Sequence, residues 1–433
     1  MKYLSFYIHF KSYKFLLLTL SILMLSWACG ADDLPVIDES IPLTPFDKPT
    51  ISDTPNGTGP GHWDKSVRAV SIDEQDIIIL TPAMDKIENN FSQLVINIPL
   101  IDKRTGEDCL TGMRATEALP EKTVARILDR ISDKGLSFDQ VIVQVDLMTP
   151  DRTSLYHQCL EESGSSGASF YVDELRRETL VAFTGLARLS EIDKIVVGLE
   201  LNAYENFDRE GNINHLWDYV NLVDMYHDIY TEIKDLNDDL KVGPSVSWSK
   251  LKLNTLPAIA EEFALELDDL LTLEFGLRRS VWPLLTKNGE KRADFVGVSF
   301  IPDTASPPYL GTPTPEDTDA VQQFYRNLSL LTSPPQLEMP LPIAYTMIDW
   351  PTQNIGSGGQ KTDYLIALKQ ALSNLSPQWV AWRRLSDIPE DPPETSPCRS
   401  VTSLGHGKDF CYAGLLDYNG VPRSVWEEFT TNP

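Results

Sequence analysis

The sequence has few basic residues, few histidines and few cysteines. Its 433 residues include 37 lysines and arginines against 63 aspartates and glutamates, which gives a formal net charge of −26 at pH 7. Such a chain is not expected to bind nucleic acid or an anionic membrane surface electrostatically. The 6 histidines and 5 cysteines show no spacing typical of a zinc site. The sequence also has no glycine-rich phosphate loop and no Gly-x-Ser-x-Gly elbow. Nucleotide-binding and serine-hydrolase functions therefore lack support, and we expect no cofactor and no metal.

A run of apolar residues at positions 15–25 follows three lysines near the N-terminus. It is shorter than the roughly 20 residues of a membrane-spanning helix, and a basic segment, a short apolar segment and a small residue describe a secretory signal peptide. Cys29 directly follows Ala28, and this order resembles the lipobox of bacterial lipoproteins, although Ser26 and Trp27 depart from it. The resemblance implies lipidation of Cys29, and ordinary signal cleavage nearby is the alternative.

The residues after Cys29 are rich in Pro, Asp, Ser, Thr and Gly, which is the composition of a flexible tether. We therefore predict a signal peptide over 1–28, a disordered tether over 29–62 and one domain over 63–433. The N-terminal lipid would be the membrane contact. This arrangement predicts an outer-membrane lipoprotein of the bacterial cell envelope, facing the periplasm or the surface, and we expect a monomer.

Four cysteines remain within the predicted domain. An even number in an exported chain suggests disulfide bonds, and three connectivities are possible. We favour local pairing over four buried thiols. The cysteines that would form these two bonds are Cys109 with Cys159 and Cys398 with Cys411.

The domain alternates β-rich apolar runs with amphipathic segments, which is the pattern of βα units. Eight strands are predicted at residues 76–80, 94–100, 141–147, 195–201, 241–247, 295–300, 343–348 and 379–385. Helices are predicted at residues 121–134, 172–189, 213–236, 317–331 and 362–372. Eight such units predict a single α/β domain folded as a (β/α)₈ TIM barrel. Long insertions at residues 104–120, 149–170 and 389–410 would lie in the loops of its active face.

The fourth predicted strand ends in Gly198-Leu199-Glu200-Leu201-Asn202. A TIM barrel carries its active site at the carboxyl ends of its strands, so Glu200 is a candidate proton donor for glycoside cleavage. The alternative is a salt-bridged structural carboxylate.

At this point the chain resembles the clan A glycoside hydrolases, and among them the arabinogalactan endo-galactanases, over residues of about 140 to 429. The resemblance rests on the ends of three predicted strands, which are Val197–Asn202, Asp294–Pro302 and Ile343–Thr352. It implies a (β/α)₈ barrel acting on carbohydrate, with Glu200 as acid/base. The strand-eight sequence Trp379-Val380-Ala381-Trp382 is similar to the tryptophan floor beneath the sugar in that clan.

Two departures from the family pattern concern the chemistry. Leu199 stands where the family has an Asn that contacts the sugar 2-hydroxyl, and the seventh strand lacks the family's nucleophilic Glu. Retaining hydrolysis needs a second carboxylate about 5–5.5 Å from the acid. Asp349 is the nearest acid to the missing one and is a candidate nucleophile or base, or it simply caps a turn. Three other acids remain open as substitutes, which are Asp146, Glu205 and Glu274.

Aromatic and amide side chains near the predicted strand ends are candidates for binding sugar. The alternative for the aromatic residues is that they belong to the core of the barrel. The residues expected to contact the substrate are Trp382, Phe300, Asn202, Trp350 and Trp248. We thus expect a glycosidase acting on a polysaccharide or oligosaccharide, and the alternative is a degenerate barrel that binds a glycan without cleaving it. A scaffold without a ligand is a third possibility.

Overall fold

The computed structural model of the chain describes part of the sequence, and every described residue lies in the compact unit Gly57–Pro433. The described residues are 63–73, 76, 80–100, 119–148, 170–204, 214–249, 251, 273–301, 318–349, 358–372, 375–387 and 414–431. The residues predicted to form a signal peptide and a tether, and all five cysteines, lie outside these residues, so the predictions made for them remain predictions.

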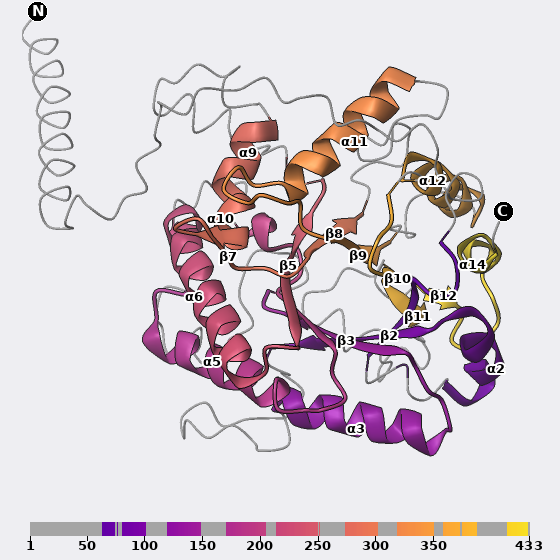
Figure 1. Cartoon of the computed structure of the whole chain (residues 1–433). Helices are drawn as coiled ribbons and strands as arrows, with labels where there is room; N and C mark the ends of the chain where they lie inside the picture. The colour runs from indigo at the N-terminus through magenta and orange to yellow at the C-terminus, as the bar shows by residue number, and fades with distance from the viewer. Residues whose placement is uncertain are drawn as a thin grey trace, which may run out of the picture. The chain divides into compact units, whose positions relative to one another are not determined.

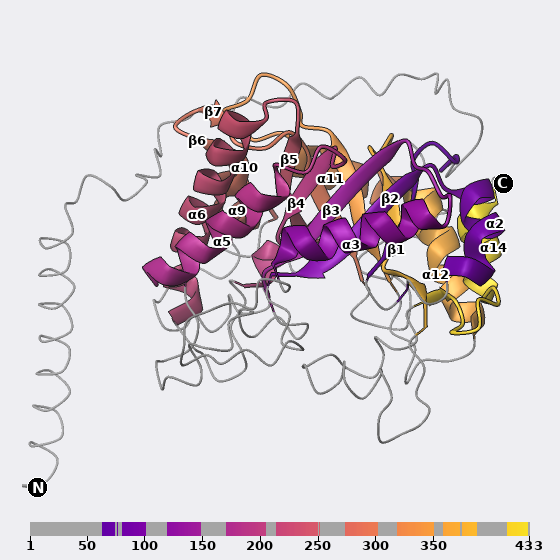
Figure 2. The ribbon, with the colours of Figure 1, turned by 90° about the horizontal axis from the view of Figure 1, so that it is seen from below.

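Eight parallel strands close into a barrel, which confirms the predicted fold class. Each strand pairs with its neighbour in parallel, and the first strand pairs with the last to complete the ring. Helices lie around the outside of the strands (Figures 1 and 2). The barrel strands are β1 (Arg68–Ile72), β2 (Gln93–Pro99), β3 (Gln140–Asp146), β4 (Lys194–Val197), β5 (Lys241–Ser247), β8 (Val296–Phe300), β9 (Ile343–Ile348) and β10 (Val380–Trp382).

Seven of these strands overlap their predicted positions, and the first does not. The prediction of a strand at 76–80 is wrong, because Leu80 begins helix α2 and Asp76 belongs to a tight turn. In that turn the backbone N–H of Asp73 donates to Asp76 Oδ2 at 3.0 Å, and the N–H of Asp76 donates to Asp73 Oδ1 at 3.2 Å. The acidic residues that preceded the apolar run thus form a turn after the true first strand.

Strand β1 escaped prediction because two of its five residues are polar. All five are buried nonetheless. Arg68 donates to the backbone carbonyl of Thr430, and Ser71 Oγ donates to that of Arg383 at 3.1 Å. A buried polar side chain is acceptable where it has a hydrogen-bond partner, and those partners come from the far end of the chain, where no local pattern can reveal them.

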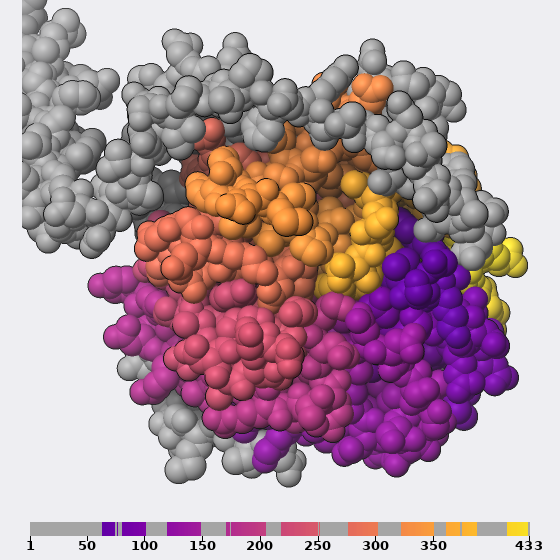
Figure 3. Space-filling view, viewed as in Figure 1, coloured from indigo at the N-terminus to yellow at the C-terminus, as the bar shows by residue number. Residues whose placement is uncertain are grey.

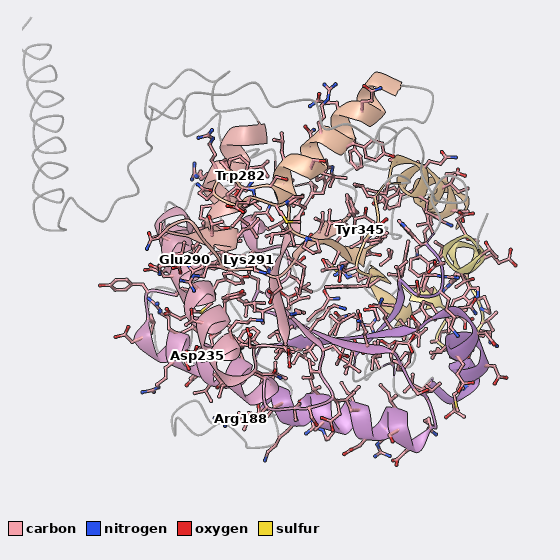
Figure 4. All side chains as sticks on the ribbon, viewed as in Figure 1. Arg188, Asp235, Trp282, Glu290, Lys291 and Tyr345 are labelled. Carbon is pink, nitrogen blue, oxygen red and sulfur yellow. The ribbon has the colours of Figure 1, made fainter. Side chains whose placement is uncertain are left out.

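The helices that cover the barrel include all five predicted ones, with ends shifted by a few residues. Helix α2 was not predicted, and neither were two further helices between β5 and β8. The indole N–H of Trp282 in the second of them donates to the carbonyl of Leu330 at 3.1 Å (Figure 4). The helices are α2 (Leu80–Asn90), α3 (Pro120–Asp133), α5 (Asp173–Leu186), α6 (Asn214–Leu236), α9 (Leu273–Ser280), α10 (Trp282–Leu285), α11 (Thr318–Thr332), α12 (Gly358–Ala371) and α14 (Ser424–Thr430).

Small additions decorate this frame. Strands β6 (Thr286–Lys287) and β7 (Glu290–Lys291) form a hairpin around Asn288 and Gly289, both of which have positive φ. An Asn-Gly pair of this kind is typical of a two-residue type I′ hairpin turn. Strands β11 (Arg384–Ser386) and β12 (Gly414–Leu416) form a parallel pair beside the end of β10.

The apolar residues form one large cluster between strands and helices and a small one inside the barrel. The inner cluster consists of Ala69, Val95, Ile142, Val196, Leu199, Phe295, Ala344, Trp379 and Ala381. The first and last described helices also pack together, since the ring of Phe91, directly after α2, lies 5.8 Å from that of Trp426 on α14. Figure 3 shows indigo surface from the first described segments beside yellow surface from the last. No helix among the described residues is long and apolar enough to cross a bilayer.

Candidate active site

The upper half of the barrel interior, toward the carboxyl ends of the strands, is polar. Successive side chains on a strand alternate between its two faces, so residues two or four positions after members of the inner apolar cluster also face inward. These positions hold polar residues on strand after strand. They are Ser71, Asn97, Gln144, Ser299, Thr346 and Arg383.

Hydrogen bonds across the barrel confirm this inward orientation. Gln144 Nε2 on β3 donates to the carbonyl of Thr346 on β9 at 3.0 Å. The hydroxyls of Ser245 and Thr346 lie 2.7 Å apart, and Asn97 donates to Ser71 Oγ at 2.5 Å. A polar floor therefore lies above the apolar plug, at the end of the barrel where enzymes of this fold carry out their chemistry.

Glu200 reaches this floor through a tight turn after β4. Gly198 has φ +75°, and a Cβ there would lie 2.1 Å from Leu201 Cδ2, so only glycine fits. Glu200 itself has φ 54° and ψ 41°, a left-handed conformation that is rare for a residue with a side chain. Such backbone strain clusters at functional sites. The turn leaves the Glu200 carboxyl buried, with 7% exposure.

The carboxyl of Glu200 is held by Ser299, whose hydroxyl donates to Glu200 Oε1 at 2.6 Å. Ser299 ends the Asp-x-x-Gly-x-Ser sequence of β8, and its three fixed residues do different work. Asp294 accepts hydrogen bonds from Lys234, Lys291 and the backbone of β5 at the opposite end of the strand. Gly297 lies against β9, where a Cβ would be 2.5 Å from Thr346 Cγ2. The serine alone belongs to the site.

Asp349 follows β9, the seventh strand of the barrel, and faces the same interior. The register between β8 and β9 shifts by one residue, so that Met347 lies opposite Ser299 and Asp349 follows on the inward side. Its Oδ2 accepts a hydrogen bond from Arg383 Nη1 at 2.6 Å. The Asp349 side chain is 2% exposed and that of Arg383 is 20% exposed. The guanidinium is therefore the more solvent-accessible member of the pair, and the carboxylate lies behind it.

Asn202 and Asp146 make structural hydrogen bonds at the strand ends. The Asn202 side chain donates to the carbonyl of Ser247 at 3.0 Å and accepts from its N–H at 2.6 Å, which ties the turn after β4 to the end of β5. Asp146 Oδ1 accepts from the N–H of Met148 at 3.2 Å. Both groups support the rim of the barrel.

Two of the aromatic residues expected to bind sugar, Phe300 and Trp382, point away from the barrel interior. Phe300 is fully buried among Tyr345, Trp248 and Phe324, and Trp382 packs against the helix-borne ring of Phe429. Their neighbours Ser299 and Arg383 face inward, so the alternation of the strands sends these two rings into the outer core. Tyr345, in the same layer, is labelled in Figure 4.

Trp248 is also buried in that outer cluster, with its ring 5.0 Å from that of Phe324. Trp350, Glu205 and the side chain of Glu274 lie outside the described residues. The structure thus brings Glu200 and Asp349 to one end of the barrel, each with a hydrogen-bond donor at its carboxylate.

The turn after β4 is also fixed from the outside by Asp218 on α6. Its carboxylate accepts from the N–H groups of Phe170 and Tyr171 at 2.7 and 2.9 Å and from the Tyr204 hydroxyl. Burial and the charge of Asp218 together raise the pKa of Tyr204 above its ordinary value. Asp218 thereby joins the segment before α5 to the segment that carries Glu200.

Sequence reasoning missed Arg383. A signal was present, because Arg383 directly follows β10 and lies two positions after Ala381, and the strand period of two places both on one face. Among the described residues, no group of three or more His, Cys, Asp or Glu side chains is arranged to hold a metal ion.

No family model matches the chain, and no curated protein matches it. Solved structures do resemble it. Exo-beta-1,4-mannosidase Op5Man5 from Opitutaceae bacterium strain TAV5 has a TM-score of 0.54 and 12% identity over 86% of this chain. This chain spans 61% of that protein's length.

Two GH5_18 structures give the same TM-score. The one from Bifidobacterium longum subsp. infantis is 11% identical and covers 84% of this chain and 77% of its own. The one from Streptomyces cattleya, in complex with Manb1-4GlcNAc, is 12% identical and covers 85% and 82%. At these identities the similarity shows the fold, a glycoside hydrolase-like (β/α)₈ barrel.

Proposed function

We propose that this chain is an exported lipoprotein whose barrel hydrolyses glycosidic bonds of a polysaccharide or oligosaccharide, with Glu200 as the proton donor. The observation that carries the proposal is the position of Glu200. It lies in a strained turn directly after the fourth strand of a glycoside hydrolase-like barrel, with its carboxyl held by Ser299 at 2.6 Å.

The contact with Ser299 orients the carboxyl of Glu200. The Ser299 hydroxyl donates to Oε1 of the ionised carboxylate. General acid catalysis needs a carboxyl held so that its hydrogen can face the leaving oxygen of the glycosidic bond. The hydrogen bond thus fixes the orientation of the acid before a substrate arrives.

Asp349 is the proposed partner carboxylate, and it acts as nucleophile or as the base that activates water. Its pairing with Arg383 keeps a cation beside the negative charge, which matches a group that reacts as an anion. Because the guanidinium is more exposed than the carboxylate, a productive sugar must displace or pass Arg383 to reach Asp349.

The second candidate function is glycan binding without hydrolysis, and two observations favour it. The Asp349–Arg383 pair satisfies the carboxylate internally. Leu199, at the position of the family's sugar-contacting Asn, belongs to the inner apolar cluster and is 6% exposed. A barrel of this kind would bind a glycan at the site without hydrolysing it.

The decisive experiment measures reducing-sugar release by the full chain on galactans, mannans, xylans and β-glucans. The variants are Glu200→Gln and Asp349→Asn, and the exposed helix residue Glu232 provides the matched control Glu232→Gln. Hydrolysis predicts release by the wild type and the control that collapses in Glu200→Gln. Absence of release, together with retardation of the wild type in a gel containing one of the glycans, would establish the binding function instead. A Cys29→Ala variant that no longer partitions into detergent would support lipidation.

A further inference from the structure

A second polar site lies at the opposite end of the barrel, where the strands begin. A cavity of about 380 Å³ opens there between the segments that lead into β1, β2, β3 and β10. Its polar lining consists of Ser66, Gln93, Asp139, Gln140 and Gln378. In TIM barrels the active site lies at the carboxyl ends of the strands, and the opposite end ordinarily serves stability. A polar cavity at this end is therefore not explained by the fold.

A buried lysine lies behind the wall of this cavity. Lys194, the first residue of β4, is 4% exposed, and its ammonium donates to the Oε1 of the cavity residue Gln140. The ammonium also lies 5.4 Å from the centre of the Trp379 ring. Burial lowers the pKa of Lys194 from its ordinary value.

Lys194 forms no ion pair with another described residue. The adjacent carboxylate of Asp193 is directed elsewhere, since its Oδ2 accepts from the N–H of Val141 at 2.7 Å. The charge of Asp193 raises the pKa of Lys194, but burial outweighs it and lowers the pKa overall, so the ammonium still carries a desolvation cost. An anion that enters the cavity would offset that cost, and the side-chain amide of Gln140 lies between the two.

Gln93 supplies a second unsatisfied group. Its Nε2 donates to the carbonyls of Ser66 and Gln378 at 2.7 and 3.1 Å, and these two bonds fix the orientation of the amide. Its Oε1 is buried and has no hydrogen-bond partner among the described residues. An acceptor in this state calls for a hydroxyl or N–H donor from a ligand.

We propose that this cavity binds a small hydroxylated monocarboxylate, the chemistry of a sugar acid, with its carboxylate directed toward Lys194 and a hydroxyl donating to Gln93 Oε1. The exposed carboxylate of Asp139 at the rim selects against ligands with several negative charges. The site lies at the other end of the barrel from Glu200, so it is independent of the proposed hydrolysis.

The test is the thermal unfolding of the full chain with sodium gluconate, sodium acetate or glucose, each at equal concentration and ionic strength. Gluconate carries both the charge and the hydroxyls, acetate the charge alone, and glucose the hydroxyls alone. We expect gluconate to raise Tm by about 2–4 °C at ten times its Kd and to exceed both other probes. An equal effect of glucose, or no shift with gluconate, would overturn the proposal.

Variants identify the site. Lys194→Met should abolish the gluconate-induced shift, whereas Lys241→Met should retain it, because Lys241 is the register partner of Lys194 on β5 and is exposed. Asp139→Asn, a change at an exposed position, should lower the Kd for gluconate several-fold without affecting glucose, which keeps the test informative if Lys194→Met folds poorly. A gluconate shift unchanged in both Lys194→Met and Asp139→Asn would place the ligand elsewhere.

Discussion

Removal of Arg383 tests how the site holds its second carboxylate. The Asp349 carboxylate is 2% exposed and lies 2.6 Å from Arg383 Nη1, whereas the arginine side chain is 20% exposed. Removal of one partner from a buried ion pair costs about 3–5 kcal/mol where the other charge is left buried without compensation. The charges of Lys361 and Asp349 also interact, so we expect a loss at the lower end of that range. The two partners are not equivalent here, since water reaches the guanidinium and not the carboxylate.

We therefore expect Arg383→Met to lower the free energy of unfolding by about 3 kcal/mol and Asp349→Asn to lower it by about 1–2 kcal/mol, the smaller figure reflecting hydration of the surviving guanidinium. The double variant should lose less than the sum, with a coupling of about 1–2 kcal/mol, because the contact between Arg383 and Asp349 can be lost only once. Urea unfolding of the four proteins gives these values.

The exposed helix residue Arg326 provides the control, and Arg326→Met should stay within about 0.5 kcal/mol of the wild type. Additive losses in the double variant, within about 0.5 kcal/mol, would refute the reasoning. That result would mean that the contact between Arg383 and Asp349 contributes nothing of its own to folding and that Arg383 does not compensate the charge of Asp349.

Three further predictions concern single residues. Ser299→Ala should lower kcat/KM about tenfold on whichever glycan the wild type cleaves, since Glu200 loses the hydrogen bond that orients it; an unchanged pH profile and rate would contradict this role. Gly297→Ala should cost about 1–3 kcal/mol in urea unfolding, because the added Cβ would lie 2.5 Å from Thr346 Cγ2, and a neutral effect would show that β8 and β9 can separate. Burial raises the pKa of Asp76 to about 7 from 3.8, so the folded state retains this proton between about pH 4 and pH 7. The contribution of Asp76 to stability is therefore full below about pH 4 and lost as the pH rises through about 7. Asp76→Asn should flatten the fall in unfolding free energy over that window, and parallel pH curves for the two proteins would count against it.

Local patterns were sufficient for most of the barrel. Strands such as Ile195-Val196-Val197 are apolar on both faces, because helices cover one side and the inner cluster fills the other. Strand β1 lacks this pattern. Its buried Arg68 and Ser71 are satisfied by backbone carbonyls of residues 430 and 383, which lie more than 300 positions along the chain.

The candidate site likewise contains residues that the sequence predicts and residues that only the structure reveals. Glu200 is visible in the sequence because a β-branched strand ends on it, and a barrel presents strand ends at its active face. The pairing of Arg383 with Asp349 cannot be predicted from the sequence, because the ion pair joins the end of β9 to the end of β10. For the rings of Phe300 and Trp382, the sequence suggested a role in sugar binding that the structure does not support. Aromatic residues near strand ends fit a sugar platform and a core equally well by composition, and only the inward direction of Ser299 and Arg383 decides between them.

By itself, the sequence determined the alternation of strands and helices, the closed parallel barrel and the placement of Glu200 at its carboxyl end, since each follows from side-chain periodicity over a few neighbouring residues. Only the tertiary structure decided which strand comes first, which aromatic side chains are core, and that Asp349 is paired with Arg383 while Lys194 is buried without an ion pair among the described residues. These features depend on contacts between strands that are distant in sequence, and a side chain's partner across a barrel is set by closure and register, which no local pattern records.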